Sequence, residues 1–291
     1  MRVIISEVSR RDCPSLALFP VGDVHIGSKA CDETALKEVI GHIKAMPNAR
    51  WIGMGDYCDF INQRDPRYDP SVLADWVSMS DLSDLAGAQK RYFLDLVRPI
   101  ADKCVGLLQG NHEASIVKHT ERDIYSEIVT SIKSDGGHDS DKPLGLGYYG
   151  WVLLKFLDHK RKKQDWSWTC RLNCHHGFTG GRLAGAKALN AQRWAWTHPS
   201  ANVVLMGHSH NTSVQVEQVE HVTPQGNVYT HNITVAYCGS YLRSTTPNAT
   251  TYSERMGMLP MPVSRIVVHI NPHWSQPNQD SSVRIETIPT K

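Results

Sequence analysis

Five short segments of the sequence combine glycine with residues that bind metal ions or transfer protons. Each follows a run of apolar residues. In chain order they are Asp23-Val24-His25, Gly55-Asp56-Tyr57-Cys58-Asp59, Gly110-Asn111-His112-Glu113, His175-His176-Gly177 and Gly207-His208-Ser209-His210. Carboxylate, amide and imidazole groups together suit Mn, Fe or Zn rather than a metal that prefers thiolates. The segments therefore predict a metal site assembled from distant parts of the chain.

The spacing inside the segments supports this interpretation. Asp23 and His25 are one residue apart, so in an extended backbone they lie on the same side and can bind one ion. The same offset separates His208 from His210, which could face one ion or two adjacent ions. A single Asp-x-His is more often a surface pair, and two consecutive histidines can simply be buried. All five segments in this order favour the metal site.

The apolar runs before these segments predict the elements that position them. Runs at 16–21, 50–54 and 104–108 indicate buried strands, and 32–46 and 82–100 have helical spacing. Side chains just beyond the strand ends of an α/β sheet converge on one crevice, where ligands bind. Further helices are expected at 124–132 and 182–196, and further strands at 148–156, 166–174, 202–206, 214–219, 228–237, 263–270 and 283–288.

Composition limits the class of protein. The chain has 291 residues, of which 41% are hydrophobic, so it can fill a sizeable core, and its formal net charge of +2 excludes an extended basic face. We expect one domain over residues 1–291, with an insertion at roughly 60–82 and a polar C-terminal tail at 271–291. The 7 cysteines include no C-x-x-C pair and favour reduced thiols. No signal peptide or membrane span is expected, which predicts a cytoplasmic protein.

The order of the five segments resembles the calcineurin-like metallophosphoesterases, and the motifs from Asp23 to His210 cover most of the chain. This resemblance implies an α/β fold, an αββα sandwich of two mixed β-sheets flanked by helices. It also implies two divalent metal ions at one edge of the sandwich. Mn is the expected metal, and Zn, Fe, Ni or Mg are also compatible with oxygen and nitrogen ligands.

The resemblance also implies a role for each matched residue. His112 is expected to contact the substrate phosphate or to protonate the leaving group, and Asp59 to orient that histidine. His176 is preferred to His175 because the family's ligand usually directly precedes glycine, here Gly177. The matched metal ligands are Asp23, His25 and His210 for the first ion, Asn111, His176 and His208 for the second, and Asp56 between them.

The activity implied by the resemblance is hydrolysis of phosphate esters, in which a hydroxide bridging the metals attacks phosphorus. Protein phosphatases of the family carry arginines where this chain has Phe60 and Gln109. Without those guanidinium groups a phosphodiester, which carries one charge fewer, is the expected substrate, as in a phosphodiesterase or nuclease. A phosphomonoesterase acting on nucleotides or small esters is the alternative. A third hypothesis is a scaffold protein of the same fold without catalytic activity.

Several polar residues near the segments are candidates for binding the substrate. Each of them is also a common type of surface residue. They are Arg182, Lys187, Asn62, Arg64 and Arg243. The expected partner is a phosphate-ester substrate, with nucleic acid and nucleotides among the candidates, and no membrane. The sequence does not predict an oligomeric state.

Overall fold

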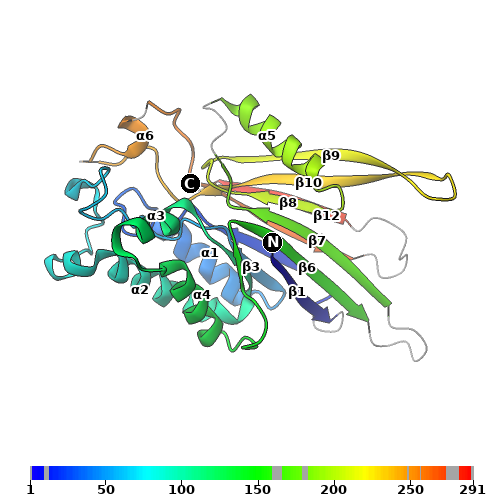
Figure 1. The fold of residues 1–291 in the computed structure, drawn as a ribbon, viewed down its shortest axis with the longest axis horizontal. Coiled ribbons are helices and arrows are strands. Elements are labelled where there is room, and N and C mark those ends of the chain that lie inside the picture. Colours follow the sequence, from blue (N-terminus) through cyan, green and yellow to red (C-terminus); the bar gives the residue numbers. More distant parts are fainter. Residues whose placement is uncertain are drawn as a thin grey trace.

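The computed structural model describes residues 2–9, 13–158, 166–178, 183–247, 249–255, 257–272 and 282–289. Its strands form two mixed sheets that face each other (Figure 1). In spatial order the first sheet contains β1 (Arg2–Ser9), β6 (Tyr149–Asp158), β7 (Trp166–His175), β8 (Val203–Met206), β10 (Val228–Ser240) and β9 (Thr212–Val222). The second contains β12 (Ser282–Pro289), β11 (Ser264–Asn271), β2 (Leu16–Val21), β3 (Ala49–Gly53), β4 (Cys104–Leu108) and β5 (Gly145–Gly147). A short antiparallel ladder between β10 and β11 joins them.

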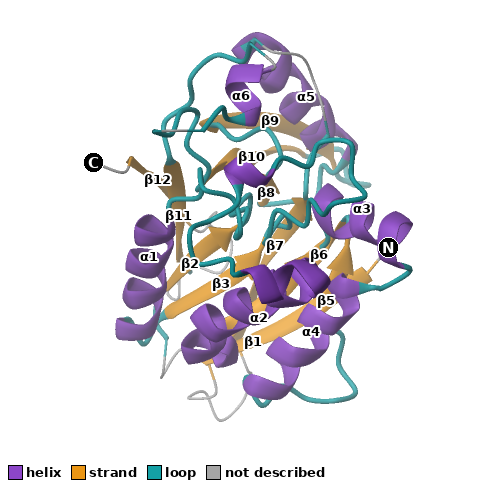
Figure 2. Ribbon diagram, turned by 90° about the vertical axis from the view of Figure 1, so that its left-hand side faces the viewer, coloured by secondary structure: helices purple, strands orange, loops and turns teal. Residues whose placement is uncertain are grey.

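Helices cover the outer face of each sheet, as Figure 2 shows for the second. On the second sheet lie α1 (Glu33–Ala45), α2 (Leu85–Val97) and α4 (Ile124–Asp135), while α5 (Ala184–Thr197) lies on the first. Two further helices, α3 (Asn111–Thr120) and the single turn α6 (Tyr252–Arg255), border the edge where the strand ends meet. Three 3₁₀ turns complete the helical structure of the described chain: Pro70–Val72, Met79–Asp84 and Arg98–Lys103.

Three buried apolar clusters lie between these four layers. One fills the space between the two sheets, one lies under α1, α2 and α4, and one lies under α5. Strand β2 contributes to two of them, because Leu16 and Leu18 face the other sheet while Phe19 and Val21 face the helices. Burial of both faces explains why β2 is a continuous apolar run rather than an alternating one. The αββα sandwich expected from the sequence is confirmed.

Several elements were not expected from local patterning, among them β1 and α3. Strand β1 pairs in parallel with β6, although the N-terminal segment carries a charged residue at Glu7. Helix α3 begins at Asn111, inside one of the five segments, and positions two candidate site residues on its first turn. The insertion at 60–82 is mostly loop, and the C-terminal tail contains β12 at the position of the strand expected there.

The cysteines have a structural role. No disulfide joins the cysteines of the described chain, and all of them are buried. Burial raises the pKa of the Cys170 thiol to about 12, so this thiol is unreactive at neutral pH. Among the described helices, none has the length and apolar character needed to cross a bilayer.

Candidate metal centre

Five strand ends bring the candidate residues to one edge of the sandwich. Strands β2, β3 and β4 run parallel in the second sheet, and β7 and β8 run parallel in the first. Their carboxyl ends therefore point to the same edge, which is the expected place for a ligand site in an α/β fold. The residues that follow these ends are Asp23 and His25 after β2, Asp56 and Asp59 after β3, Asn111 and His112 after β4, His176 after β7, and His208 and His210 after β8.

The backbone at these positions is unusual. Seven non-glycine residues of the described chain have a positive φ, and five of them are candidate metal ligands. The left-handed region is costly for residues with a Cβ, and such strain concentrates at functional sites. The five are Asp23, His25, Asp56, His208 and His210, with φ between 47° and 64°. This conformation turns side chains from the strand ends toward a common point.

Asp23, His25 and His210 form the first cluster. Nε2 of His210 lies 3.4 Å from Oδ1 of Asp23 and 3.2 Å from Nε2 of His25. Oδ1 of Asp23 is buried, and it accepts no hydrogen bond from the described residues. A buried oxygen that accepts no hydrogen bond lowers the stability of the fold unless a cation or a proton lies against it. Burial acts to raise the pKa of Asp23, but the charges of His210 and His176 lower it below its ordinary value.

The second cluster consists of Asp56, His176 and His208, with Asn111 beside it. Nε2 of His176 lies 3.4 Å from Oδ2 of Asp56 and 3.1 Å from Oδ1 of Asn111. Nδ1 of His176 donates to the carbonyl of Met54 at 2.7 Å, which leaves Nε2 with a lone pair directed at those oxygens. In the neutral ring Nε2 is an acceptor that faces two further acceptors, so a positive charge must lie between them, either a proton on Nε2 or a bound cation. Burial acts to lower the pKa of His176, but the Asp56 carboxylate raises it to about 10.

Asp56 lies between the two clusters. Its carboxylate belongs to one potential ligand group with His176 and His208, and to another with His25 and His112. Oδ1 of Asp56 accepts a hydrogen bond of 2.9 Å from the backbone N–H of His112, at the positive end of α3. Burial would raise the pKa of Asp56, but the neighbouring histidines hold it well below its ordinary value. Asp56 is therefore charged and positioned to contact cations in both clusters.

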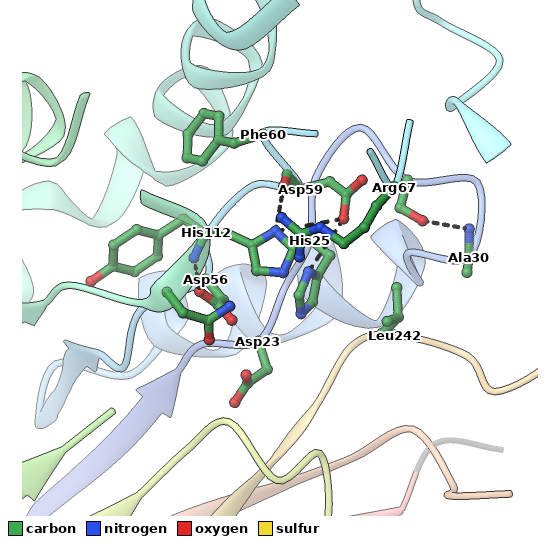
Figure 3. A network of polar contacts seen from close by, with 12 residues as sticks. Asp23, His25, Ala30, Asp56, Asp59, Phe60, Arg67, His112 and Leu242 are labelled. Carbon is green, nitrogen blue, oxygen red and sulfur yellow. Dashed lines mark hydrogen bonds and ion pairs between the residues drawn. The ribbon is translucent and has the colours of Figure 1, made fainter. Parts of the chain in front are cut away.

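His112 lies beside the first cluster, as Figure 3 shows, with its ring edge-on to that of His25 at 4.7 Å. Its Nδ1 is hydrogen-bonded to the backbone carbonyl of Asp59. As the donor of that bond, Nδ1 leaves Nε2 as the atom available to a substrate. Burial acts to lower the pKa of His112, but the Asp56 and Asp59 carboxylates raise it above its ordinary value.

The Asp59 side chain lies beside two histidines. Its Oδ1 forms ion pairs with Nδ1 of His25 at 3.5 Å and with Nδ1 of His112 at 3.9 Å when those rings are protonated. The backbone of Asp59 is held against Ile26, with its N–H donating to the Ile26 carbonyl at 2.9 Å. That contact turns the Asp59 carbonyl toward His112. The main chain orients His112, and the carboxylate acts on both histidines through its charge.

Only one of the two consecutive histidines enters the clusters. His175 accepts a hydrogen bond of 2.7 Å from the backbone N–H of Gly177, and its ring packs against Trp194 at 4.5 Å. Successive side chains at a strand end point to opposite faces, so His176 faces the opposite way and meets Asn111 and Asp56. The geometry favours His176 over His175.

Glu113 has a positioning role that sequence reasoning missed. Its buried carboxylate accepts three backbone hydrogen bonds, from Gly110 at 2.7 Å, Asp56 at 2.9 Å and Tyr57 at 2.8 Å. These bonds fasten the loop after β3 to the start of α3. A signal was present in the sequence, because an acidic residue three positions after the helix N-cap is typical of a capping box.

We expect Glu113→Gln to destabilise the protein by about 2 kcal/mol, since one amide N–H would face a backbone donor and leave it unpaired. The loop that carries Asp56 should shift, so metal content should fall as well. Denaturant unfolding and metal analysis of the purified variant measure both effects. Glu220→Gln, an exposed change on β9, is the control and should match the wild type. Wild-type stability and metal content in Glu113→Gln would contradict the role.

A cavity of about 380 Å³ opens over the two clusters. His25, Asp56, Asn111, His112, His208 and His210 form its polar floor. Lys187 and Arg67 add positive charge to its walls. Nζ of Lys187 donates to the carbonyl of Ser209 at 2.9 Å, and burial lowers its pKa. The candidate Lys187 therefore lies at the site.

Of the other candidate substrate contacts, Asn62, Arg64 and Arg243 are not part of the cavity lining. Oδ1 of Asn62 accepts from the N–H of Arg64 at 2.9 Å, which closes a turn outside the cavity lining, and Arg64 is exposed. Arg243 forms an ion pair of 2.9 Å with Asp32 at the start of α1. Arg182 lies outside the described residues. The guanidinium at the cavity belongs instead to Arg67, from the same insertion.

Arg67 is positioned by Asp65 through two hydrogen bonds. Nε donates to Oδ1 at 3.0 Å and Nη2 donates to Oδ2 at 2.7 Å, while the carboxylate of Asp65 is buried. Figure 3 shows the Arg67 side chain reaching toward Asp59 and His25. Arg64 and Arg67 are three residues apart in an irregular loop, so local sequence could not distinguish which of them faces the site.

Comparison with known proteins adds little to this geometry. No family model matches the chain, and no curated protein matches it. Among solved structures, Vps29 complexed with Zn²⁺ from Entamoeba histolytica has a TM-score of 0.37 at 12% identity, covering 94% of this chain and 99% of that one. A conserved uncharacterised protein from Streptococcus pneumoniae, described as a predicted phosphoesterase, has a TM-score of 0.32 at 11% identity, covering 94% and 90%. Scores this low carry no argument about function.

The support for a metal site comes from the geometry of this chain. Its four layers and the meeting of the five segments at one edge agree with the resemblance to the calcineurin-like metallophosphoesterases. The arrangement also fits divalent cations, because the buried Oδ1 of Asp23 and Nε2 of His176 each lie within 3.4 Å of another potential ligand atom. The described residues thus provide a potential metal-binding site of carboxylate and imidazole groups.

Proposed function

We propose that this protein is a metal-dependent phosphoric ester hydrolase that acts on phosphodiesters. The observation that carries the proposal is the pair of clusters described above, one with Asp23 and the other with Asp56, each with ligand atoms within 4.8 Å of one another. Asp56 also shares a ligand group with His25 of the first cluster. A single ion would leave one of these clusters without a partner. Two ions would occupy both clusters, and Asp56 would contact each ion.

The residues that would hold the ions follow from the clusters. Asp23, His25 and His210 would bind the first, and Asn111, His176 and His208 the second. When bound, two such cations lower the pKa of a water held between them and neutralise charge on the phosphate oxygens. Oxygen and nitrogen ligands of this kind suit Mn, and Zn, Fe, Ni or Mg are compatible with the same donors.

The chain's own groups would act on the leaving group. His112 donates a proton from Nε2 to the ester oxygen as the P–O bond breaks, while water provides the new oxygen on phosphorus. The Asp59 carbonyl holds Nδ1 of this ring and fixes its tautomer. The nearby Asp56 and Asp59 charges favour the protonated form that this role requires.

The charge of the cavity supports a diester. Phe60 and Gln109 replace the arginines that would bind a phosphoryl dianion, and the charge of Arg67 is offset by Asp65. A diester anion needs less neutralisation than a monoester dianion. The presence of both Arg67 and Lys187 at the cavity favours the monoesterase as the second candidate. The complete donor set in the clusters argues against a silent scaffold.

Removal and return of metal tests the proposal. Chelator-treated protein should lose hydrolysis of bis-p-nitrophenyl phosphate, and Mn²⁺, Zn²⁺, Fe²⁺ or Mg²⁺ added singly should restore it to different degrees. With the best metal, kcat/KM for the diester should exceed that for p-nitrophenyl phosphate by about tenfold or more. A preference for the monoester would support the second candidate. Absence of metal-dependent hydrolysis of either ester would favour the scaffold.

A further inference from the structure

The wall of the cavity above the clusters is apolar. The connection between β10 and β11 contributes Leu242, Met258, Leu259 and Met261, and Phe178 contributes from the loop after β7. Figure 3 shows Leu242 at the margin of the histidine group. A site for phosphate alone needs polar donors, so this wall has no role in the chemistry described above.

Three side chains of this wall are large, apolar and exposed. The exposed fraction is 41% for Phe178, 45% for Met258 and 61% for Leu259. Contact between such side chains and water is unfavourable, and a ligand that covers them gains free energy in proportion to the apolar area removed from water. Their position at a cavity that contains ionisable groups indicates a ligand with both an anionic and an apolar part.

The connection that carries this wall is anchored. Oγ of Ser244 donates to the carbonyl of Met261 at 3.1 Å and accepts from its N–H at 2.7 Å, while Oγ1 of Thr251 donates to the Ser244 carbonyl at 2.5 Å. An ion pair between Arg255 and Asp69 links it to the insertion at 60–82, and Figure 1 shows α6 beside that insertion. These contacts hold the apolar wall in a defined position over the cavity.

The chemistry of the wall favours an aromatic group. The Phe178 ring packs edge-on against that of His175, with the ring centroids 5.6 Å apart, and it stays partly exposed. Exposed rings stack on aromatic ligands, and methionine sulfur contacts aromatic rings favourably. A cavity of about 380 Å³ also falls in the size range that encloses an organic ligand.

We propose that Phe178, Met258, Leu259 and their apolar neighbours form a subsite for an aromatic ester group of the substrate. The substrate class is then a phosphodiester whose non-leaving group carries an aromatic ring, such as a nucleobase. This inference rests on the proposed hydrolase function. In this arrangement the substrate phosphate lies over the two clusters, and its aromatic ring lies against the connection between β10 and β11.

Two diesters with the same leaving group test the subsite. Phenyl p-nitrophenyl phosphate and methyl p-nitrophenyl phosphate both release p-nitrophenolate, so their difference reports on the non-leaving group. With Mn²⁺-loaded protein, kcat/KM should favour the phenyl ester by about tenfold or more. In the double variant Met258→Ser/Leu259→Ser the ratio should fall to within about threefold of unity. Met79→Ser, which changes a side chain that is 85% exposed and outside the cavity, should keep the wild-type ratio.

A binding measurement separates failure of the subsite from failure of the hydrolase. Calorimetry with phenylphosphonate and methylphosphonate needs no turnover, and the wild type should bind the phenyl compound more tightly while the double variant loses the difference. If neither diester is hydrolysed, the proposed function is wrong and the binding result alone decides the subsite. Equal use or equal binding of the two compounds by the wild type, or a preference that survives in the double variant, would overturn the inference.

Discussion

Asp56→Asn is expected to lower metal affinity by at least about 100-fold and to abolish most hydrolysis. Asparagine has nearly the same shape and can still accept the N–H of His112, so the start of α3 should stay in place. The charge between the two clusters is lost, however, and an amide N–H₂ could face Nε2 of His176. Metal content and kcat/KM should therefore fall together while the fold persists.

Metal analysis, circular dichroism and diester assays on the same preparation distinguish this result from unfolding. Asp102→Asn, a change of an exposed aspartate outside the cavity lining, is the matched control and should keep both metal and activity. If Asp56→Asn hydrolysed diesters at the wild-type rate with unchanged metal content, Asp56 would not contact the metals.

His112→Ala is expected to retain metal and lose turnover by about 10²- to 10⁴-fold on esters with alkoxide leaving groups. The hydrogen bond from His112 to Asp56 comes from the backbone N–H of His112, which alanine also provides. The side chain is needed for the proton that an alkoxide takes as it leaves. p-Nitrophenolate leaves without a proton, so the loss on p-nitrophenyl esters should be much smaller.

Comparison of the two leaving groups is the informative measurement. His221→Ala, a change on β9 away from the cavity, is the control and should behave as the wild type on both esters. An equal loss on both leaving groups would indicate that His112 binds the phosphate rather than protonating the leaving oxygen. Loss of metal from His112→Ala would place it among the ligands and contradict the proposed role.

Most of the secondary structure could be predicted because it depends on local periodicity. The strand expected at 104–108 is β4 (Cys104–Leu108), and the helix expected at 124–132 is α4 (Ile124–Asp135). Strand β1 was missed because its pattern of apolar and charged residues is irregular, and its pairing with β6 is about 150 residues distant. Helix α3 was missed because its first turn, Asn111-His112-Glu113-Ala114, is also part of a site segment and is mostly polar.

The composition of the candidate site was also accessible from sequence. Residues able to bind metals follow apolar strands in five places, and parallel strands must bring those ends together whatever the details of packing. The sequence could not show the orientation of individual groups. The choice of His176 over His175, of Arg67 over Arg64, and the contact of His112 with the carbonyl of Asp59 appear only in three dimensions.

Sequence alone therefore predicted most of the elements, the chemical groups that follow their ends, and the class of reaction those groups could support. The tertiary structure alone decided which atoms meet, as Glu113 illustrates by fastening loops that are 56 residues or more apart in sequence. The physical reason is a difference in range. Helix and strand preferences arise from neighbours within a few residues, whereas a contact at 3 Å depends on backbone angles accumulated over the whole intervening chain.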